Sequence, residues 1–205
     1  MAVMSVNPTR MELKRLKRKL DLAVHGYKPL KDKRDAMMRR FIPLIRENYT
    51  LRANVERKLS EAFGEFSLCQ GAMDPSMLDA ALLLPARSAT VDAETVNIMS
   101  VRAPRFTAAV GDETLSYGLV QTSALLDSSI QLLASALPDL IKLAEIEKTC
   151  DLLADEIART NRRVNALEHK VIPDLTDTIR FIAMKRYEIE LGERVRLMKV
   201  KDLIS

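Results

Sequence analysis

The chain has 205 residues, of which 47% are hydrophobic, 29% charged and only 4% aromatic, with 6 Gly, 8 Pro and 2 Cys. So few Gly and Pro exclude a low-complexity or collagen-like chain, and two cysteines cannot form the disulfide framework of a small secreted domain. The uncharged stretches are shorter than the roughly 20 apolar residues that span a bilayer, and the first residues do not resemble a signal peptide. We therefore expect a cytoplasmic protein without a membrane segment of its own.

Charge is unevenly distributed along the chain. Residues 1–62 carry a net charge of +9, residues 63–120 a net −4 and the remainder a net −1. Four of the six glycines also lie in the middle block. These shifts predict two long elements separated by an insert. The three expected segments are residues 1–66, 67–120 and 121–205.

The first segment has the apolar spacing of a coiled-coil helix. Apolar residues recur every three or four positions, with breaks near Arg34 and Arg52. Thr9 and Glu12 have the spacing of a capping box, so we expect the helix to begin at Thr9 and to extend about 85 Å. The expected apolar stripe is Leu13, Leu16, Leu20, Val24, Tyr27, Leu30, Met37, Phe41, Ile45, Tyr49, Val55, Leu59, Ala62 and Phe66.

The last segment repeats this pattern between Leu126 and Ile189. Each helix is polar away from one narrow stripe, so neither is expected to be stable alone. The predicted fold is therefore mainly α, a long antiparallel two-helix coiled coil with both chain ends together. The expected register places Thr9 beside Lys201.

Four prolines interrupt the two helical patterns. Pro29 and Pro43 lie in the first helix, and Pro138 and Pro173 in the second. A proline lacks the N–H that a helix interior requires, at a cost of roughly 3 kcal/mol. Because the apolar pattern resumes after each proline, we expect kinks and not breaks.

The middle insert has a different pattern from its neighbours. It begins with a short helical segment, SMLDAALLL at residues 76–84. A run rich in β-branched residues follows over residues 89–110, and Pro104 interrupts it. This composition predicts short helices and a β-hairpin.

Residues that could carry chemistry are few. The chain lacks the phosphate-binding motif G-x-x-x-x-G-K-[ST] and the dinucleotide motif G-x-G-x-x-G, so we expect no nucleotide hydrolysis, catalytic residue or cofactor. His25 and His169 are expected about 25 Å apart, too far to share a metal ion. Cys69 and Cys150 are expected to pack as small hydrophobic residues.

Basic residues provide the main candidate for a binding surface. Six cations lie between Arg10 and Lys19, and in the expected register a second group joins them from the last helix. Such a surface could be an ordinary solvated face, or it could bind nucleic acid or an acidic protein socket. No aromatic cluster accompanies it to stack bases. The candidate residues are Arg10, Lys14, Arg15, Lys17, Arg18, Arg194, Arg196, Lys199 and Lys201.

Several blocks of the sequence resemble the D subunit of V-type (A/V-type) ATPases, in its bacterial form. They come in the family's order over nearly the whole chain. Pro29 and Pro43 depart from the family pattern, in which an aliphatic residue is expected. The blocks are NPTRMELKRLKRKL at residues 7–20, GYKPLKDKRD at 26–35, NIMSV at 97–101, LAEIEKTC at 143–150, RRVNALEH at 162–169, VIPDLTDTIRFI at 171–182 and RLMKVK at 196–201.

This resemblance implies a non-catalytic rotor shaft on the cytoplasmic side of the membrane. In the family, both chain ends enter the catalytic ring of A and B subunits, the F subunit binds alongside the coiled coil, and a funnel-shaped C/d subunit joins the shaft to the membrane ring that moves H⁺ or Na⁺. The nine cations are then implied to contact the ring. The alternatives are an unrelated coiled-coil scaffold and a basic nucleic-acid-binding protein. Residues implied to form a regulatory contact near the F subunit or the lower stalk are Asn97, Ile98, Met99, Arg102, Arg105 and Phe106.

Overall fold

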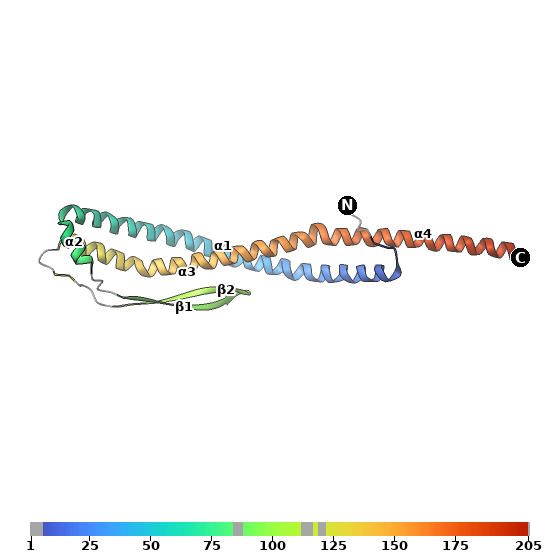
Figure 1. Ribbon diagram of the computed structural model, residues 1–205, viewed down its shortest axis with the longest axis horizontal. Coiled ribbons are helices and arrows are strands. Elements are labelled where there is room, and N and C mark those ends of the chain that lie inside the picture. Colours follow the sequence, from blue (N-terminus) through green and yellow to red (C-terminus); the bar gives the residue numbers. More distant parts are fainter. Residues whose placement is uncertain (1–5, 84–87, 112–116, 119–121, 205) are drawn as a thin grey trace. The chain divides into compact units, whose positions relative to one another are not determined.

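The computed structural model describes residues 6–83, 88–111, 117–118 and 122–204. It confirms a mainly α fold with two long helical stretches and a small insert (Figure 1). The elements are α1 (Arg10–Ala72), α2 (Pro75–Leu82), β1 (Ala89–Ile98), β2 (Val101–Val110), α3 (Ala124–Ala166), the π-helical turn η1 (Leu167–Val171) and α4 (Ile172–Ile204).

Contacts divide the chain into two units. The terminal unit comprises residues 1–36 and 157–205, and the insert unit comprises residues 37–156. Each unit has its own hydrophobic cluster. The helices α1 and α3 contribute residues to both units.

Helix α1 begins where the sequence predicts. The backbone N–H of Glu12 donates to Thr9 Oγ1 at 3.2 Å, which satisfies one of the free N–H groups of the first turn. The helix then continues without a break through Pro29 and Pro43, both of which are exposed. It ends at Ala72, beyond the Phe66 at which the apolar pattern stops.

The inward face of α1 follows a strict heptad pattern. From Leu13 to Cys69, every position on alternating steps of three and four is buried or half-buried. Such spacing keeps one seam of a helix facing its partner. The seam residues are Leu13, Leu16, Leu20, Ala23, Tyr27, Leu30, Arg34, Met37, Phe41, Leu44, Asn48, Leu51, Val55, Lys58, Ala62, Glu65 and Cys69.

This seam departs from the predicted apolar stripe at five positions, and two of them, Leu59 and Phe66, are half-buried beside the seam residues Lys58 and Glu65. Val24, Ile45 and Tyr49 are 47%, 45% and 76% exposed, so they lie off the seam. Ala23 and Asn48 occupy the seam positions beside them. The prediction was wrong there because the seam includes small and polar residues, which a pattern of large apolar residues does not reveal.

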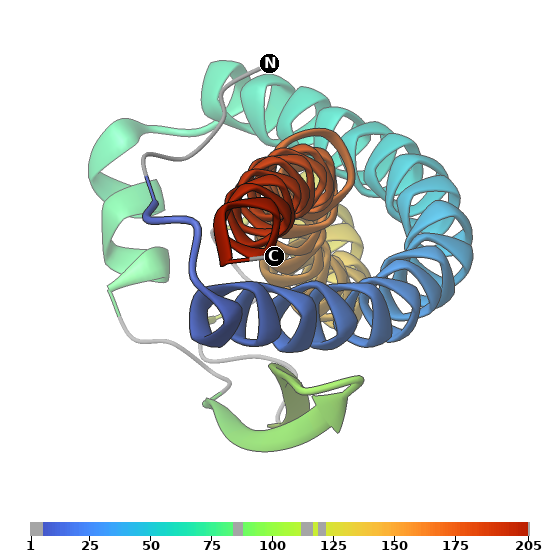
Figure 2. The same ribbon diagram turned by 90° about the vertical axis from the view of Figure 1, so that its right-hand side faces the viewer.

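In the terminal unit, α1 runs antiparallel to the end of α3 and to α4. Leu16 packs with Leu175 and Ile182, and all three are at most 4% exposed. Figure 2 shows the start of α1 beside α4 when this unit is viewed from its end. Arg10 lies 3.5 Å from Glu190.

That ion pair shows that the predicted register was wrong. Thr9 lies near Glu190, not beside Lys201, which is eleven residues further along α4. A repeating apolar pattern permits several registers, and the ends of the two patterns do not have to coincide. The register is fixed by individual packing and ionic contacts that periodicity does not reveal.

The insert unit packs α1 against the first part of α3. Cys69, Leu78 and Leu126 form a buried cluster that joins α1, α2 and α3. Lys58 Nζ lies 2.7 Å from Asp139 Oδ2 across the α1–α3 seam. Cys69 is fully buried, with its Sγ 3.4 Å from Met73 Sδ, and this confirms its packing role.

The strands form one antiparallel hairpin, as predicted. Ile98 pairs with Val101, and the two turn residues Met99 and Ser100 have φ values of 53° and 75°. Positive φ at both central residues is the geometry of a type I′ turn. Ser100 N–H donates to Asn97 Oδ1 at 2.9 Å, which helps a turn without glycine to adopt this conformation.

One helical stretch in the described part of the chain, Ala124–Ile204, is long and apolar enough to cross a membrane by length and composition. Two of its carboxylates are nevertheless engaged by other parts of the chain. Asp139 pairs with Lys58, and Asp127 accepts a hydrogen bond from the Tyr117 hydroxyl at 2.5 Å. A long helix that packs against other helices of a protein can have the same length and apolar composition.

We expect Ile182→Ala to lower the free energy of unfolding by about 2–5 kcal/mol, because the fully buried side chain would leave a cavity. Ile189→Ala is the matched control, since Ile189 is 51% exposed on the same helix, and it should change stability by no more than about 0.5 kcal/mol. Urea unfolding followed by circular dichroism measures both. Equal effects of the two substitutions would contradict the assigned core.

Candidate functional site

The described residues contain no cluster of three or more His, Cys, Asp or Glu side chains that could hold a metal ion. His25 Nε2 lies 3.3 Å from Asp21 on an exposed helix face, and His169 is also exposed. Cys150 is half-buried, and burial raises the pKa of its thiol. The other candidate residues lie on the surfaces of the helices and the hairpin.

The basic surface occupies the first turns of α1. All the predicted cations there, from Arg10 to Lys19, are exposed. A shallow groove of about 430 Å³ crosses this surface, and its lining includes Met11, Arg15 and Leu22. Because Met11 and Leu22 are 79% and 73% exposed, the cations lie between apolar side chains.

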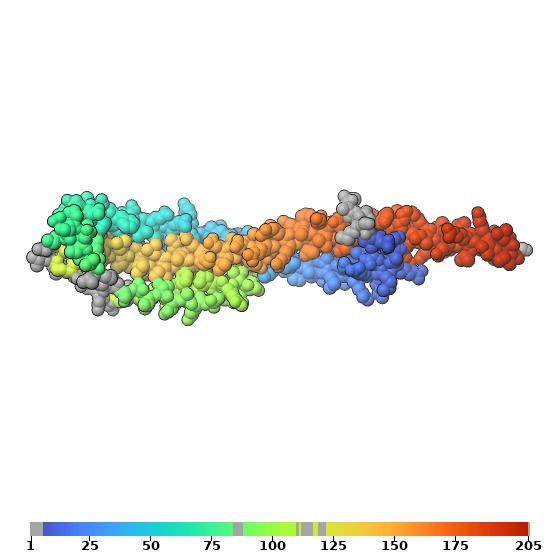
Figure 3. Space-filling model, viewed as in Figure 1, coloured from blue at the N-terminus to red at the C-terminus, as the bar shows by residue number. Residues whose placement is uncertain are grey.

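The α4 end, residues 191–204, is the second surface. Every one of its residues is exposed, and Figures 1 and 3 show that it extends past the start of α1. The predicted cations Arg194, Arg196, Lys199 and Lys201 alternate here with large apolar residues. The exposed apolar residues are Leu191, Val195, Leu197, Met198, Val200, Leu203 and Ile204.

The structure does not merge the two predicted basic groups into a single cluster. Arg10 lies against Glu190, and the C-terminal cations follow further along α4. The nine residues therefore occupy two successive zones of the terminal unit. The α4 end combines charge with apolar surface, a property that the pattern of cations alone does not reveal.

The α1 outer stripe, defined as Met38, Ile42, Ile45 and Tyr49, is the third surface. These side chains are 37–76% exposed, and their spacing of four, three and four places them on one helix face. A groove of about 420 Å³ lies beside the stripe, between α1 and α3, and its lining includes Phe41 and Ala154. Exposed apolar residues at helical spacing indicate a site for a partner helix.

Polar contacts hold the helices together beside this groove. Arg52 Nε donates to Glu147 Oε1 at 3.1 Å, and this carboxylate raises the pKa of Arg52. Glu47 pairs with Lys142 at 3.3 Å. The groove is thus bounded by helices whose register is fixed, as a preformed binding site requires.

The hairpin contacts α3 through β2. Ala103 and Val101 are 1% and 7% exposed, and Phe106 N–H donates to Glu145 Oε2 at 2.8 Å. The strand β1 is exposed along its length up to Asn97. Figure 3 shows the hairpin lying along the surface of α3.

The six predicted hairpin residues therefore divide into two groups. Ile98, Met99 and Phe106 are half-buried, whereas Asn97, Arg102 and Arg105 are exposed. Only the exposed group presents its side chains fully to a partner. No metal or cofactor chemistry is suggested by either group.

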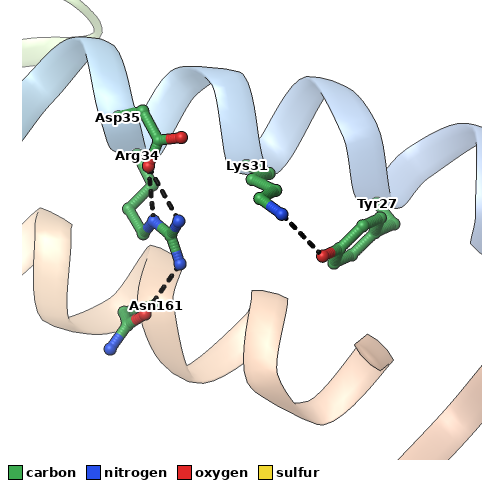
Figure 4. A network of polar contacts seen from close by, with 5 residues as sticks. All are labelled: Tyr27, Lys31, Arg34, Asp35 and Asn161. Carbon is green, nitrogen blue, oxygen red and sulfur yellow. Dashed lines mark hydrogen bonds and ion pairs between the residues drawn. The ribbon is translucent and has the colours of Figure 1, made fainter. Parts of the chain in front are cut away.

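The terminal unit contains a polar network at the break in the apolar pattern near Arg34 (Figure 4). Arg34 donates to Asp35 at 2.9 Å and to Asn161 at 3.4 Å across the two helices. Lys31 donates to the Tyr27 hydroxyl at 3.3 Å, and this hydrogen bond raises the pKa of Lys31. The breaks in the apolar pattern at Arg34 and Arg52 thus mark cross-helix polar contacts.

We expect Lys58→Glu to lower the free energy of unfolding by about 1–2 kcal/mol, because it places a second carboxylate beside Asp139 in the seam. The double variant Lys58→Glu/Asp139→Lys should recover most of that loss. Arg57→Glu, at an exposed neighbouring position, is the control for a change of net charge. If the double variant were less stable than the single one, the α1–α3 register would be wrong.

Known proteins resemble this chain over its whole length. The family model for the ATP synthase D subunit matches residues 12–202. The V-type ATP synthase D subunit of Acetivibrio thermocellus is 49% identical over 208 residues, which cover 100% of this chain and 94% of the relative. Its counterpart in Clostridium botulinum is 47% identical, covering 98% and 96%. A relative of the same name in Thermoanaerobacter sp. is 42% identical, covering 100% and 99%.

Proposed function

The chain belongs to the ATP synthase D-subunit family, and from this premise we propose that it is the central shaft of a V-type ATPase. The shaft couples ATP hydrolysis or synthesis in a ring of A and B subunits to ion movement through a membrane ring. The chain itself is not an enzyme and supplies no catalytic group. It lies on the cytoplasmic side, peripheral to the membrane.

The observation that carries this proposal is the α4 end. Residues 191–204 form about 20 Å of helix on which all side chains are exposed, many of them large and apolar. Such a surface is costly in water and is typical of a segment that inserts into a partner. The central hole of the catalytic ring would surround this helix and bury its exposed side chains.

The asymmetry of the terminal unit provides a mechanism. The basic surface on α1 and the mixed α4 end contact different ring subunits at any one angle, because they lie in different zones of the unit. As the shaft turns, each A/B pair meets a different surface and its closed state is stabilised to a different extent. A difference of about 5.5 kcal/mol, spread over many contacts, is enough to shift a two-state equilibrium from 1:99 to 99:1.

We assign the F subunit to the α1 outer stripe. An amphipathic helix that lies on this stripe would bury Ile42, Ile45 and Tyr49 and would fill the groove beside them. The exposed face of the hairpin, with Arg102 and Arg105, is assigned a regulatory contact with the F subunit or the lower stalk.

The funnel-shaped C/d subunit is assigned to the end of the insert unit where α1 meets α2. Large apolar side chains are exposed there, on the last turns of α1 and on α2 and the residue after it. They would be buried by a partner that joins the shaft to the membrane ring. These side chains are Phe63, Leu68, Met77, Leu82 and Leu83.

Alanine substitution of the cations should weaken assembly with the A/B ring by at least about tenfold at low salt and reduce the salt dependence of binding. The variant carries Ala at Arg15, Arg18, Arg194 and Arg196, all of which are exposed. Lys28→Ala and Arg57→Ala serve as controls, because both are exposed and lie outside the two basic zones. Binding of the purified chain to the A/B ring is measured by titration at two salt concentrations. Unchanged affinity at both would refute the ring contact, and tight, salt-sensitive binding to DNA or RNA instead would favour the nucleic-acid alternative.

Ile45→Asp should lower the affinity for the F subunit by at least about tenfold, because it places a charge in the apolar contact. Ile189→Asp is the matched control, since Ile189 is also about half exposed but lies on α4. Titration calorimetry of the full chain with the purified F subunit measures the effect, and co-purification checks the stoichiometry. A one-to-one complex that survives Ile45→Asp would place this partner elsewhere.

A further inference from the structure

The π-helical turn η1 interrupts the helical stretch of the terminal unit. Ile172 N–H donates to the carbonyl oxygen of Leu167, five residues earlier, instead of to Glu168. A π turn inside an α-helix is rare, and a structural cause is required to maintain it. Pro173, the next residue in the chain, provides that cause.

Pro173 removes a backbone hydrogen bond from either helical pattern at this point. In an α-helix the carbonyl of His169 would accept from residue 173, and in a π-helix the carbonyl of Glu168 would do so. Proline has no N–H, and its ring clashes with the carbonyl four residues earlier. The carbonyls of Glu168 and His169 therefore lack their α-helical donors, because the N–H of Ile172 donates to Leu167 and Pro173 has no N–H.

Packing around η1 is lighter than on either side of it, although Val171, its last residue, packs half-buried against the cluster of Leu16, Leu175 and Ile182. None of its five residues is buried, whereas Val164 before it and Leu175 after it are 0% and 4% exposed. The neighbouring part of α1 presents the polar network of Tyr27, Lys31 and Arg34 (Figure 4). Long polar side chains can follow a small displacement of their partners, which close-packed apolar side chains resist.

We propose that η1 and Pro173 form a torsional joint, at which α4 twists relative to the last turns of α3 more easily than either helix twists internally. When a backbone N–H changes its acceptor from the carbonyl five residues earlier to the one four residues earlier, the turn contains one residue fewer. One residue of an α-helix corresponds to about 100° of rotation about the helix axis. Leu175 and Ile182 remain buried against α1, so only a fraction of this rotation occurs in each excursion. Given the proposed function as a shaft, the joint lets the α4 end lag behind the rest of the terminal unit while the ring resists rotation.

Hydrogen exchange of the full-length protein, resolved by mass spectrometry, tests the local opening of backbone hydrogen bonds on which the joint depends. Amides of residues 168–172 should exchange at least about tenfold faster than those of residues 157–164, because their ladder opens locally. Pro173→Ala restores a donor and should slow exchange in residues 168–172 by about fivefold or more. Pro138→Ala is the matched control, because Pro138 lies within the uninterrupted helix α3, and it should leave exchange at η1 unchanged.

Either of two results would overturn the joint. One is exchange at residues 168–172 as slow as in residues 157–164 of the unsubstituted chain. The other is a Pro173→Ala variant, folded by circular dichroism, whose η1 amides exchange at the original rate. Because the measurement needs no ATPase partners, failure of the joint leaves the shaft proposal intact, and failure of ring binding leaves the joint intact.

Discussion

Each long helix has a single narrow apolar face and buries it against the other helix, and the rest of the structure depends on this constraint. The heptad seam of α1 satisfies this constraint from Leu13 to Cys69. It contacts the end of α3 and α4 in the terminal unit, and the first part of α3 in the insert unit. A seam of this width leaves most of each helix surface available for partners. The binding surfaces are consequently the off-seam faces and the helix ends.

Polar residues within the seam have a specific role. Arg34 and Lys58 occupy heptad positions and bond to Asn161 and Asp139 across the helices. An apolar seam alone would be compatible with several registers, whereas such contacts are satisfied in only one. A polar seam position packs less tightly than an apolar one, but it defines the register of the two helices.

The sequence allowed prediction of the local features that depend on neighbouring residues. The Thr9 cap, the short helix after Asp74 and the hairpin around Asn97 all follow from residue types at fixed short spacings. The nine cations and six hairpin residues remain candidate contacts, since only partner binding can test them. The sequence blocks also led to the right family, because many short matches occurred in one order.

Register and the true seam were beyond the reach of periodicity. Ile45 and Tyr49 look like core residues by hydrophobicity, yet they lie on the outer stripe, whereas Asn48 lies on the seam. The ion pair of Arg10 with Glu190 required three-dimensional packing to identify. The exposed α4 end followed from that register, so it too could not be predicted. Pro29 and Pro43 are accommodated on exposed positions of a continuous helix.

Direct observation of rotation tests the central claim that this chain is a shaft. A bead is attached to a cysteine introduced by Leu83→Cys, at a position that is 78% exposed, and the A/B ring is fixed to a surface. Cys69 is fully buried and does not compete for the label, and Cys150→Ser removes the half-buried second thiol. Addition of ATP should turn the bead continuously in one direction, and removal of ATP should stop it. A bead that stays bound to an ATP-hydrolysing ring without turning would contradict the account.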